Sequence, residues 1–328
     1  MNLNWKNKLE KIDPGIFSDK NLIHKLNSYT KQKNKNILLK SNNNVAVSSM
    51  IKSKIMDQIN DHGGIKLIYI DPPYFTEKTQ LMKKSNNSNI AYEDIYNHSI
   101  EDYLNEIYTQ LKLLYYLLSE DGSIYVHVDY RTSSYIRLIL DEIFGQKNLK
   151  GYLIWNINNG AKSRKFWSNQ HNDILVYSKS EKFIFNSSSI HLKTEFSESS
   201  LKTHFRKKDK DGRAFRERKI NSKSYKYYAE DGKLVGSVWN DINSMEANSP
   251  LMKEYTPYPT QKPVSLLTRI ISASSNIGDF IMDSYCGSGT SLVTADKLDR
   301  NWIGIDQSEN AMRTIKERLE KDNFFSIS

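Results

Sequence analysis

The stretch IKLIYIDPPYFTE, residues 65–77, places a mostly hydrophobic run directly before an acid and two prolines. A short run of this kind, bounded by prolines, is typical of a buried parallel strand. Pro72 and Pro73 have a fixed φ and no amide hydrogen, so they end the strand and hold a stiff turn. Asp71 is therefore expected at the carboxyl end of a strand, the edge at which open α/β sheets bind their ligands.

Strand and helix patterns alternate along the rest of the chain. The predicted strands are 37–40, 66–70, 123–129, 153–156, 173–179, 280–283 and 301–306. The predicted helices are 104–118, 134–144, 264–275, 291–298 and 309–321. Such alternation indicates an α/β fold with a doubly wound, mostly parallel sheet, covered on both faces. The polar stretch from about 75 to 98 is predicted to be a long loop that acts as a lid.

Composition limits the class of protein. A chain of 328 residues, 38% of them hydrophobic, can bury the core of one large α/β domain or two smaller ones. No hydrophobic run reaches the roughly 18 residues of a membrane span, and the first residues lack a signal sequence, so we expect a cytoplasmic protein without membrane contact. The single cysteine, Cys286, excludes an internal disulfide and a multi-cysteine zinc site, and no metal is expected.

The DPPY motif has the chemical groups needed to activate an exocyclic amine on a heterocycle. The Asp71 carboxylate and the free carbonyl of Pro72, aimed at one point, can accept both hydrogens of an exocyclic amine. Two such acceptors draw the nitrogen towards sp³ geometry and free its lone pair, while Tyr74 offers a flat ring for stacking. Taken alone, a strand end followed by an ordinary turn explains the same residues at least as well.

A second motif, DSYCGSGTS (283–291), also lies between a predicted strand and a predicted helix. Gly287 and Gly289 let the backbone approach a ligand, and the helix that follows favours a negatively charged group at its N-terminus. Asp306 ends the next strand, in the position from which an acid reaches ribose hydroxyls. The third glycine of a dinucleotide fingerprint is missing, which favours a nucleoside ligand smaller than NAD.

Positive charge is concentrated between residues 202 and 226. This segment holds eleven lysines and arginines against three acids, a local excess of eight in a chain whose net charge is +9. Aromatic residues are interleaved with the cations, as on surfaces that contact phosphates and stack on bases. A solvated basic loop has the same composition, so charge alone does not separate the two interpretations.

These motifs together resemble the amino-methyltransferases of DNA that use S-adenosyl-L-methionine, in the permuted order called the β class. In that order the DPPY motif comes first, the target-recognition region lies in the middle, and the glycine motif comes last, as in this chain. The resemblance extends over most of residues 35–320, including YPTQKPVSLLTRIISASSNIGDFIMDSYCGSGTS (258–291) before and within the glycine motif. It implies a permuted Rossmann-like methyltransferase domain.

The resemblance assigns catalysis to Asp71, Pro72, Pro73 and Tyr74. Asp rather than Ser at the first of these positions implies N6 of adenine as the acceptor, reached by direct transfer to a base flipped out of the duplex. The implied cofactor-binding residues are Asn42, Asn43, Asp71, Lys262, Asp283, Tyr285, Gly287, Gly289, Thr290 and Asp306. Asn42 departs from the family pattern, which usually has Asp there.

Four segments follow from the motif order. They are an N-terminal arm (1–34), a catalytic half (35–159), a basic target-recognition insert (160–255) and a cofactor-binding half (256–328). Within the insert, the candidate contacts to double-stranded DNA are Lys207, Lys208, Arg213, Arg216 and Arg218. The resemblance also implies a homodimer and a cognate restriction endonuclease as partners.

Other functions remain compatible with the same residues. Methyl transfer to structured RNA or to N4 of cytosine in DNA would use the same fold and motifs. A protein side-chain amide is disfavoured because the related tetrad of such enzymes usually begins with Asn. A nucleic-acid-binding module that has lost catalysis would keep the basic insert but would not need Asp71, Tyr74, Gly287 or Asp306.

Overall fold

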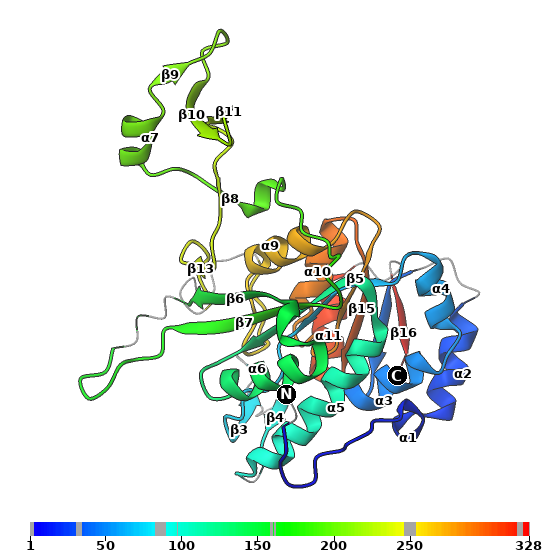
Figure 1. Ribbon diagram of the computed structural model, residues 1–328. Coiled ribbons are helices and arrows are strands. Elements are labelled where there is room, and N and C mark those ends of the chain that lie inside the picture. The colour runs from blue at the N-terminus through cyan, green and yellow to red at the C-terminus, as the bar shows by residue number, and fades with distance from the viewer. Residues whose placement is uncertain are drawn as a thin grey trace. The chain divides into compact units, whose positions relative to one another are not determined.

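The computed structural model describes residues 3–30, 35–82, 90–96, 98–157, 160, 162–245, 254–319 and 324–327. The chain divides into two compact units (Figure 1). The larger unit comprises Met1–Phe185 and Ser237–Ser328, and the smaller unit is Asn186–Gly236.

A mostly parallel sheet forms the centre of the larger unit. Nine strands of the described residues make it up, in the order β13 (Val238–Trp239), β6 (Leu149–Asn156), β7 (His171–Ser178), β5 (Leu118–Val128), β2 (Ile65–Ile70), β14 (Phe280–Asp283), β15 (Asn301–Asp306), β1 (Ile37–Lys40) and β16 (Phe325–Ile327). Among the described residues of this sheet, β7 alone runs antiparallel to both of its neighbours, β5 and β6. The predicted α/β fold is confirmed, and the predicted strands 37–40, 280–283 and 301–306 have the bounds that the sequence indicated.

Helices cover both faces of this sheet (Figure 1). One core cluster draws on α2 (Lys20–Tyr29), α3 (Asn43–Ile51), α4 (Ile55–Asp61), α5 (Ile100–Leu117) and α6 (Ser133–Phe144). The other draws on α9 (Val264–Ser274), α10 (Thr290–Lys297) and α11 (Glu309–Arg318). Two short elements, α1 (Pro14–Phe17) and η1 (Gln146–Asn148), complete the helices of this unit among the described residues.

Strand β2 shows why its sequence reads as a continuous hydrophobic run. Ile68 and Ile70 belong to the first core cluster, whereas Leu67 and Tyr69 belong to the second, so alternate side chains are buried on opposite faces. A strand buried on both faces has no polar side, and its pairs with β5 and β14 place it in the middle of the sheet.

The prediction of a loop from about 75 to 98 is wrong in one respect. This stretch contains an antiparallel hairpin, in which β3 (Lys78–Leu81) pairs with β4 (Ile90–Asp94). The hairpin was missed because its two short strands, KTQL and IAYED, show no clear alternation of hydrophobic and polar residues. Residues 83–89 and 97 of this stretch lie outside the described residues.

The N-terminal segment is part of the larger unit rather than a separate arm. Leu26 and Tyr29 of α2 are buried in its first core cluster. The Trp5 indole donates a hydrogen bond to Asn105 of α5 over 2.8 Å. Helix α2 therefore adds to the layer of helices on that face. No helix among the described residues is both long and apolar enough to cross a membrane.

The smaller unit, Asn186–Gly236, covers fewer residues than the predicted insert of 160–255. Residues 171–178, which the sequence analysis assigned to the insert, form β7 of the central sheet, because β7 pairs with both β5 and β6. The smaller unit contains η2 (Ile190–Leu192), β8 (Lys193–Thr194), α7 (Glu198–His204), β9 (Lys207–Lys208), β10 (Ala214–Ile220), β11 (Lys223–Tyr228) and β12 (Lys233–Leu234). Strands β9, β10 and β11 form one small sheet, and β8 pairs with β12.

Candidate active site

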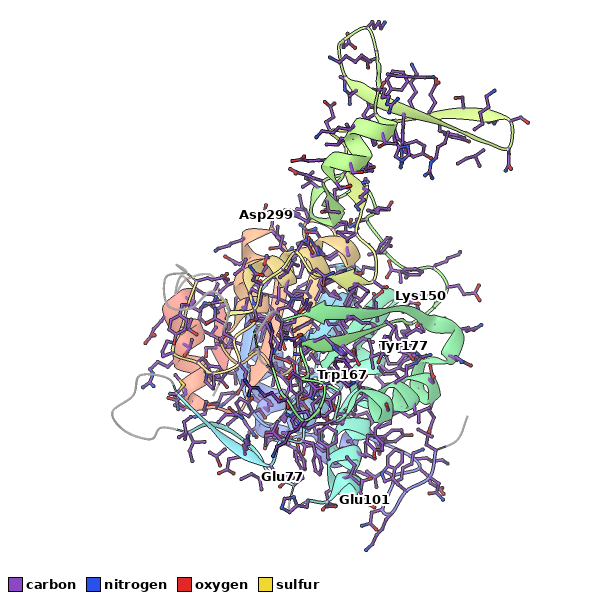
Figure 2. All side chains as sticks on the ribbon, turned by 90° about the vertical axis from the view of Figure 1, so that its left-hand side faces the viewer. Glu77, Glu101, Lys150, Trp167, Tyr177 and Asp299 are labelled. Atoms are coloured by element: carbon purple, nitrogen blue, oxygen red, sulfur yellow. The ribbon has the colours of Figure 1, made fainter. Side chains whose placement is uncertain are left out.

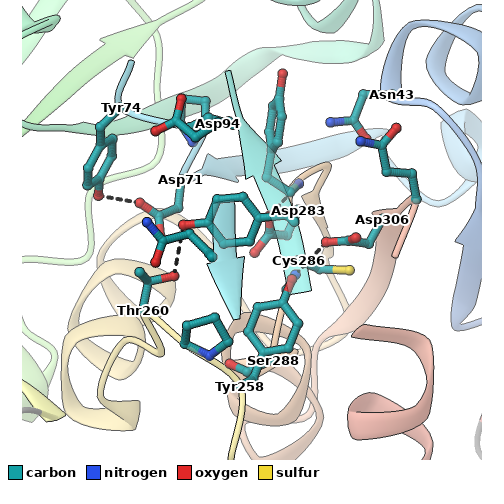
Figure 3. Close-up of a pocket in the computed structure, with 18 of the residues that line it drawn as sticks. Asn43, Asp71, Tyr74, Asp94, Tyr258, Thr260, Asp283, Cys286, Ser288 and Asp306 are labelled. Atoms are coloured by element: carbon teal, nitrogen blue, oxygen red, sulfur yellow. Dashed lines mark hydrogen bonds between the residues drawn. The ribbon is translucent and has the colours of Figure 1, made fainter. Parts of the chain in front are cut away.

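A pocket of about 340 Å³ lies at the carboxyl ends of β2, β14 and β15 (Figure 3). Parallel strands bring these ends together, although Asp71 follows β2 and Asp283 and Asp306 close strands more than 200 residues later. Every predicted catalytic and cofactor-binding residue lines the pocket except Gly289. The volume is within the range of small-molecule sites, which begins at about 300 Å³.

The catalytic motif is held by a network centred on the Asp71 carboxylate. The Tyr74 hydroxyl donates a hydrogen bond to one carboxylate oxygen, and the Lys262 ammonium donates one to the other. Burial alone would raise the pKa of Asp71, but the Lys262 charge and both hydrogen bonds outweigh it and lower the pKa below the ordinary value. Asp71 is therefore a carboxylate at neutral pH.

His127 packs behind the Tyr74 ring and is fully buried. The two ring centroids are 6.2 Å apart, and the His127 nitrogens lie 2.9 Å from the Tyr69 hydroxyl and 3.0 Å from the Asn172 amide nitrogen. Burial lowers the pKa of His127 to about 3, so the imidazole is neutral. His127 therefore has a structural role: it packs against the Tyr74 ring and helps to hold it in place.

The glycine motif forms the turn between β14 and α10. Gly289 has a φ of +74° and is the N-cap residue, directly before the first residue of α10. The Gly287 amide donates a hydrogen bond of 2.9 Å to Asp306, and the Tyr285 amide donates one of 3.0 Å to Asp283. These bonds fix two carboxylates and the N-terminus of α10 around the same part of the pocket.

The groups on this side of the pocket fit S-adenosyl-L-methionine. Asp306 can accept hydrogen bonds from ribose hydroxyls, and the N-terminus of α10 favours a carboxylate. A β-carbon at Gly287 would lie 3.1 Å from the Tyr258 ring, so glycine lets this ring close the pocket. Tyr258 and Tyr285 supply aromatic walls on which an adenine or a methionine chain can pack.

Three predicted cofactor residues make other contacts in this structure. The Asn42 side chain caps α3 by accepting hydrogen bonds from the amides of Asn44 and Val45. The Asn43 side chain lies beside the Tyr285 hydroxyl and opposes the rise that burial causes in the pKa of Tyr285. Lys262 forms an ion pair with Asp71 and also donates a hydrogen bond of 3.3 Å to the Thr260 carbonyl.

Sequence reasoning missed several residues of the pocket, among them Asp94, Glu106 and Tyr258. Asp94 accepts hydrogen bonds of 2.8 and 2.6 Å from the Thr76 amide and hydroxyl, which tethers the segment after the catalytic motif to the β3–β4 hairpin. Tyr258 lies inside the stretch that resembles the family, and this was the available signal. Asp94 and Glu106 carry no local signal, since tertiary packing alone brings them to the pocket.

Asp283 has an unusual protonation equilibrium. Burial raises its pKa from 3.8 to about 7, although the Ser291 hydroxyl and the Tyr285 amide donate hydrogen bonds to it. The native protein therefore binds a proton at Asp283 that the unfolded chain releases above about pH 4. The free energy of unfolding falls as the pH rises from about 4 to about 7.

The Asp283→Asn variant is expected to lose this part of the pH dependence, because asparagine does not ionise. One pKa unit corresponds to about 1.4 kcal/mol, so the wild-type protein should lose up to about 4 kcal/mol relative to the variant between pH 4 and pH 8. Urea unfolding of both proteins across this range measures the difference. A constant difference between the two curves would show that Asp283 is already ionised at acid pH.

The predicted DNA-binding residues all lie in the smaller unit, in different electrostatic surroundings. Lys207 forms an ion pair with Glu217, and Arg213 forms ion pairs with Glu230 and Asp231. The Arg216 guanidinium lies 5.2 to 5.6 Å from three aromatic ring centroids, those of Phe196, Phe205 and Tyr227. Lys208 and Arg218 are exposed and have no ion pair among the described residues. The cations are therefore not equivalent.

Known proteins similar to this chain are DNA methyltransferases. The Type II methyltransferase M.EcaI of Enterobacter cloacae is 29% identical over 300 residues, which cover 77% of this chain and 64% of M.EcaI. The DNA adenine methyltransferase YhdJ of Escherichia coli K12 is 27% identical over 265 residues, covering 80% of this chain and 78% of YhdJ. This chain thus spans less than two thirds of the length of M.EcaI.

A solved structure confirms the class of fold. The Thermus thermophilus protein TTHA0409, in complex with S-adenosyl-L-methionine, superposes with a TM-score of 0.50 at 14% identity, covering 89% of this chain and 98% of that one. The DNA methylase family of the N6/N4 type matches residues 65–317, which include both motifs and the sheet that joins them. The predicted methyl donor, S-adenosyl-L-methionine, is confirmed with the family. The chain therefore belongs to the N6/N4 DNA methylase family.

Proposed function

We propose that this protein transfers the methyl group of S-adenosyl-L-methionine to N6 of a flipped-out adenine in duplex DNA. One observation carries the proposal: the Asp71 carboxylate is held ionised in the same pocket as the Gly287 turn and Asp306. An acceptor for amine hydrogens and a nucleoside-binding edge are thereby placed side by side. Direct transfer requires this proximity, since alignment of the two reactants supplies much of the rate enhancement.

Asp71 and Pro72 position the target amine in the proposed reaction. S-adenosyl-L-methionine supplies an electrophilic sulfonium methyl group when it is bound. Asp71 accepts one amine hydrogen and the Pro72 carbonyl accepts the other, while Tyr74 stacks on the base. The new N–C bond would form as the S–C bond breaks, which leaves S-adenosyl-L-homocysteine, and the methylated nitrogen would then release its proton to solvent. Asp71 stabilises the positive charge that develops on the nitrogen.

The target amine meets two existing hydrogen-bond donors at Asp71. The two carboxylate oxygens of this residue already accept hydrogen bonds from Tyr74 and Lys262, and because each oxygen keeps a second lone pair, the amine can bind beside these donors or replace one of them. Lys262 is the donor that can leave, because the cofactor carboxylate offers it another anionic partner. Its ammonium also lies 5.5 Å from the centroid of the Tyr74 ring, the surface on which the base would stack.

Adenine is favoured over cytosine as the acceptor by Asp71 and by the name of the relative YhdJ. The proposed cofactor-binding residues remain Asn43, Asp71, Lys262, Asp283, Tyr285, Gly287, Gly289, Thr290 and Asp306, with Asn42 acting through the cap of α3. A homodimer and a companion restriction endonuclease remain predictions from the family resemblance.

Isotopic labelling tests the proposal directly. The protein is incubated with methyl-labelled S-adenosyl-L-methionine and unmethylated duplex DNA or bulk RNA, and the digested nucleosides are then separated. Label in N6-methyldeoxyadenosine is the expected result. Label in N4-methyldeoxycytidine would move the acceptor to cytosine, and label only in RNA would change the substrate. DNA binding without any transfer would instead support a module that has lost catalysis.

The smaller unit is the proposed DNA-contacting insert. Its free cations should contribute more to DNA affinity than its ion-paired cations, since the latter already have an acidic partner. The slope of log K against log salt concentration is negative, and replacing Lys208 and Arg218 together by alanine is expected to reduce its magnitude by about two. The matched control is the double alanine replacement of Lys207 and Arg213, which should lower it less. Binding to one duplex at several salt concentrations measures both slopes, and equal slopes would contradict the distinction.

A further inference from the structure

An aromatic loop of the larger unit presents two rings to solvent. This loop, KSRKFW (162–167), lies between β6 and β7. Trp167, labelled in Figure 2, is 96% exposed, and Phe166 is 70% exposed. Trp167 is the most exposed large hydrophobic side chain of the described residues. Two adjacent exposed rings give the loop a contiguous apolar surface, and contiguous apolar surface is typical of sites that bind a partner.

Three cations accompany these rings. Lys162, Arg164 and Lys165 are exposed, and none of them forms an ion pair within the described part of the chain. The aromatic loop itself contains no acid. Unpaired cations beside exposed rings match a polyanion that also offers flat apolar faces, and nucleic acid has both properties.

The aromatic loop starts from the edge of the sheet that carries the candidate active site. Strand β7 runs antiparallel to β5 and begins beside its carboxyl end, since Asp173 pairs with Val128. Asn172, at the start of β7, contacts His127, which packs behind Tyr74. The chain that continues from the loop into β7 is therefore linked to Tyr74, the proposed stacking platform, through Asn172 and His127.

Local hydrogen bonds give the aromatic loop a defined turn. The Ser163 hydroxyl accepts hydrogen bonds of 3.1 and 3.4 Å from the amides of Lys165 and Phe166, and the Ser163 amide donates one of 2.7 Å to the Ser168 hydroxyl. A turn that is ordered while its rings remain exposed loses little conformational freedom when it binds. The two rings are therefore presented outward by the fold of the chain.

We propose that the aromatic loop enters duplex DNA beside the target base and that Trp167 stacks in the gap left when this base is flipped out. The three cations contact the flanking phosphates. A duplex resists the loss of a stacked base, and an inserted ring that restores stacking lowers this resistance. This inference rests on the proposed function and adds to it the group that stabilises the opened duplex.

The test compares two DNA duplexes that carry the same target site, mapped from the labelling experiment. In the first the target base is paired, and in the second it faces an abasic position, where flipping is easier. The Trp167→Ala variant is expected to lose about tenfold to a hundredfold in kcat/KM on the paired duplex, in line with the stacking of one ring on a base. On the abasic duplex the loss should be less than about threefold, and Trp167→Phe should retain most of the activity on both.

The control is Tyr116→Ala, which removes another exposed ring. Tyr116 is 56% exposed and lies at the C-terminal end of α5, which leads into the amino end of β5, the end of the strand that is opposite to the pocket. This variant should leave both rates unchanged. Equal losses on the two duplexes in Trp167→Ala, or no loss on either, would overturn the inference. Failure of the proposed function is recognised separately, because the wild-type protein would then methylate neither duplex.

Discussion

The Asp71→Ala variant is expected to transfer methyl groups about a thousandfold more slowly than the wild-type protein, at saturating concentrations of both substrates. Asp71 is ionised and aimed into the pocket, so its removal takes away the charge that stabilises the developing amine cation. Single-turnover transfer of labelled methyl groups to DNA measures the effect on the chemical step itself. DNA affinity should change little, because the proposed DNA contacts lie in other parts of the chain.

Glu181→Ala is the matched control for the loss of one carboxylate. Glu181 is exposed and pairs at the surface with Lys147 over 3.5 Å, so its removal should leave transfer unchanged. A rate for Asp71→Ala within about tenfold of the wild type would contradict the proposed mechanism, since loss of one preorganised charge-stabilising group costs about 100-fold to 1000-fold. Transfer would then depend on alignment alone.

The Gly289→Ala variant is expected to be destabilised and to bind S-adenosyl-L-methionine at least about tenfold more weakly. Gly289 has a φ of +74°, and a β-carbon there would lie 2.6 Å from the Ile315 side chain. The strained backbone costs about 1 to 2 kcal/mol, and crowding of the core adds about 1 to 3 kcal/mol. The start of α10 would shift as a result. Urea unfolding and calorimetric titration with the cofactor measure the two effects.

Gly278→Ala separates backbone strain from crowding. Gly278 has a φ of +82°, but nothing lies within 4 Å of the position that a β-carbon would take. This variant should therefore lose only the strain component of the unfolding free energy and keep its cofactor affinity. Equal destabilisation of the two variants would mean that Ile315 moves aside without cost. The close approach of Ile315 of α11 to the turn at Gly289 would then be unimportant.

Local rules were sufficient for the strands that carry the site. Prolines that cannot continue a ladder fixed the end of β2, and glycines that permit positive φ fixed the turn before α10. The same rules placed Asp71, Asp283 and Asp306 at strand ends, and the parallel sheet then brought them together. These predictions succeeded because each depends on a few adjacent residues and on one general property of parallel sheets.

Other features depend on contacts between distant residues and could not be predicted. Lys262 was predicted as a cofactor-binding residue, whereas its ion pair with Asp71, which joins residues 191 positions apart, was not predicted. Asp94 reaches the pocket through the β3–β4 hairpin, whose exposed strands lack a hydrophobic pattern. Residues 171–178 were assigned to the insert for a related reason, since the sequence of β7 does not reveal that its partners are β5 and β6.

The position of β14 in the sheet has a consequence for biosynthesis. This strand lies between β2 and β15, yet it begins at residue 280, long after β2 has left the ribosome. Until then β2 has β5 on one side and an unpaired edge on the other, and such edges attract other chains. Closure of the sheet is a late, non-local step of folding, which favours slow folding and a need for protection of the nascent chain.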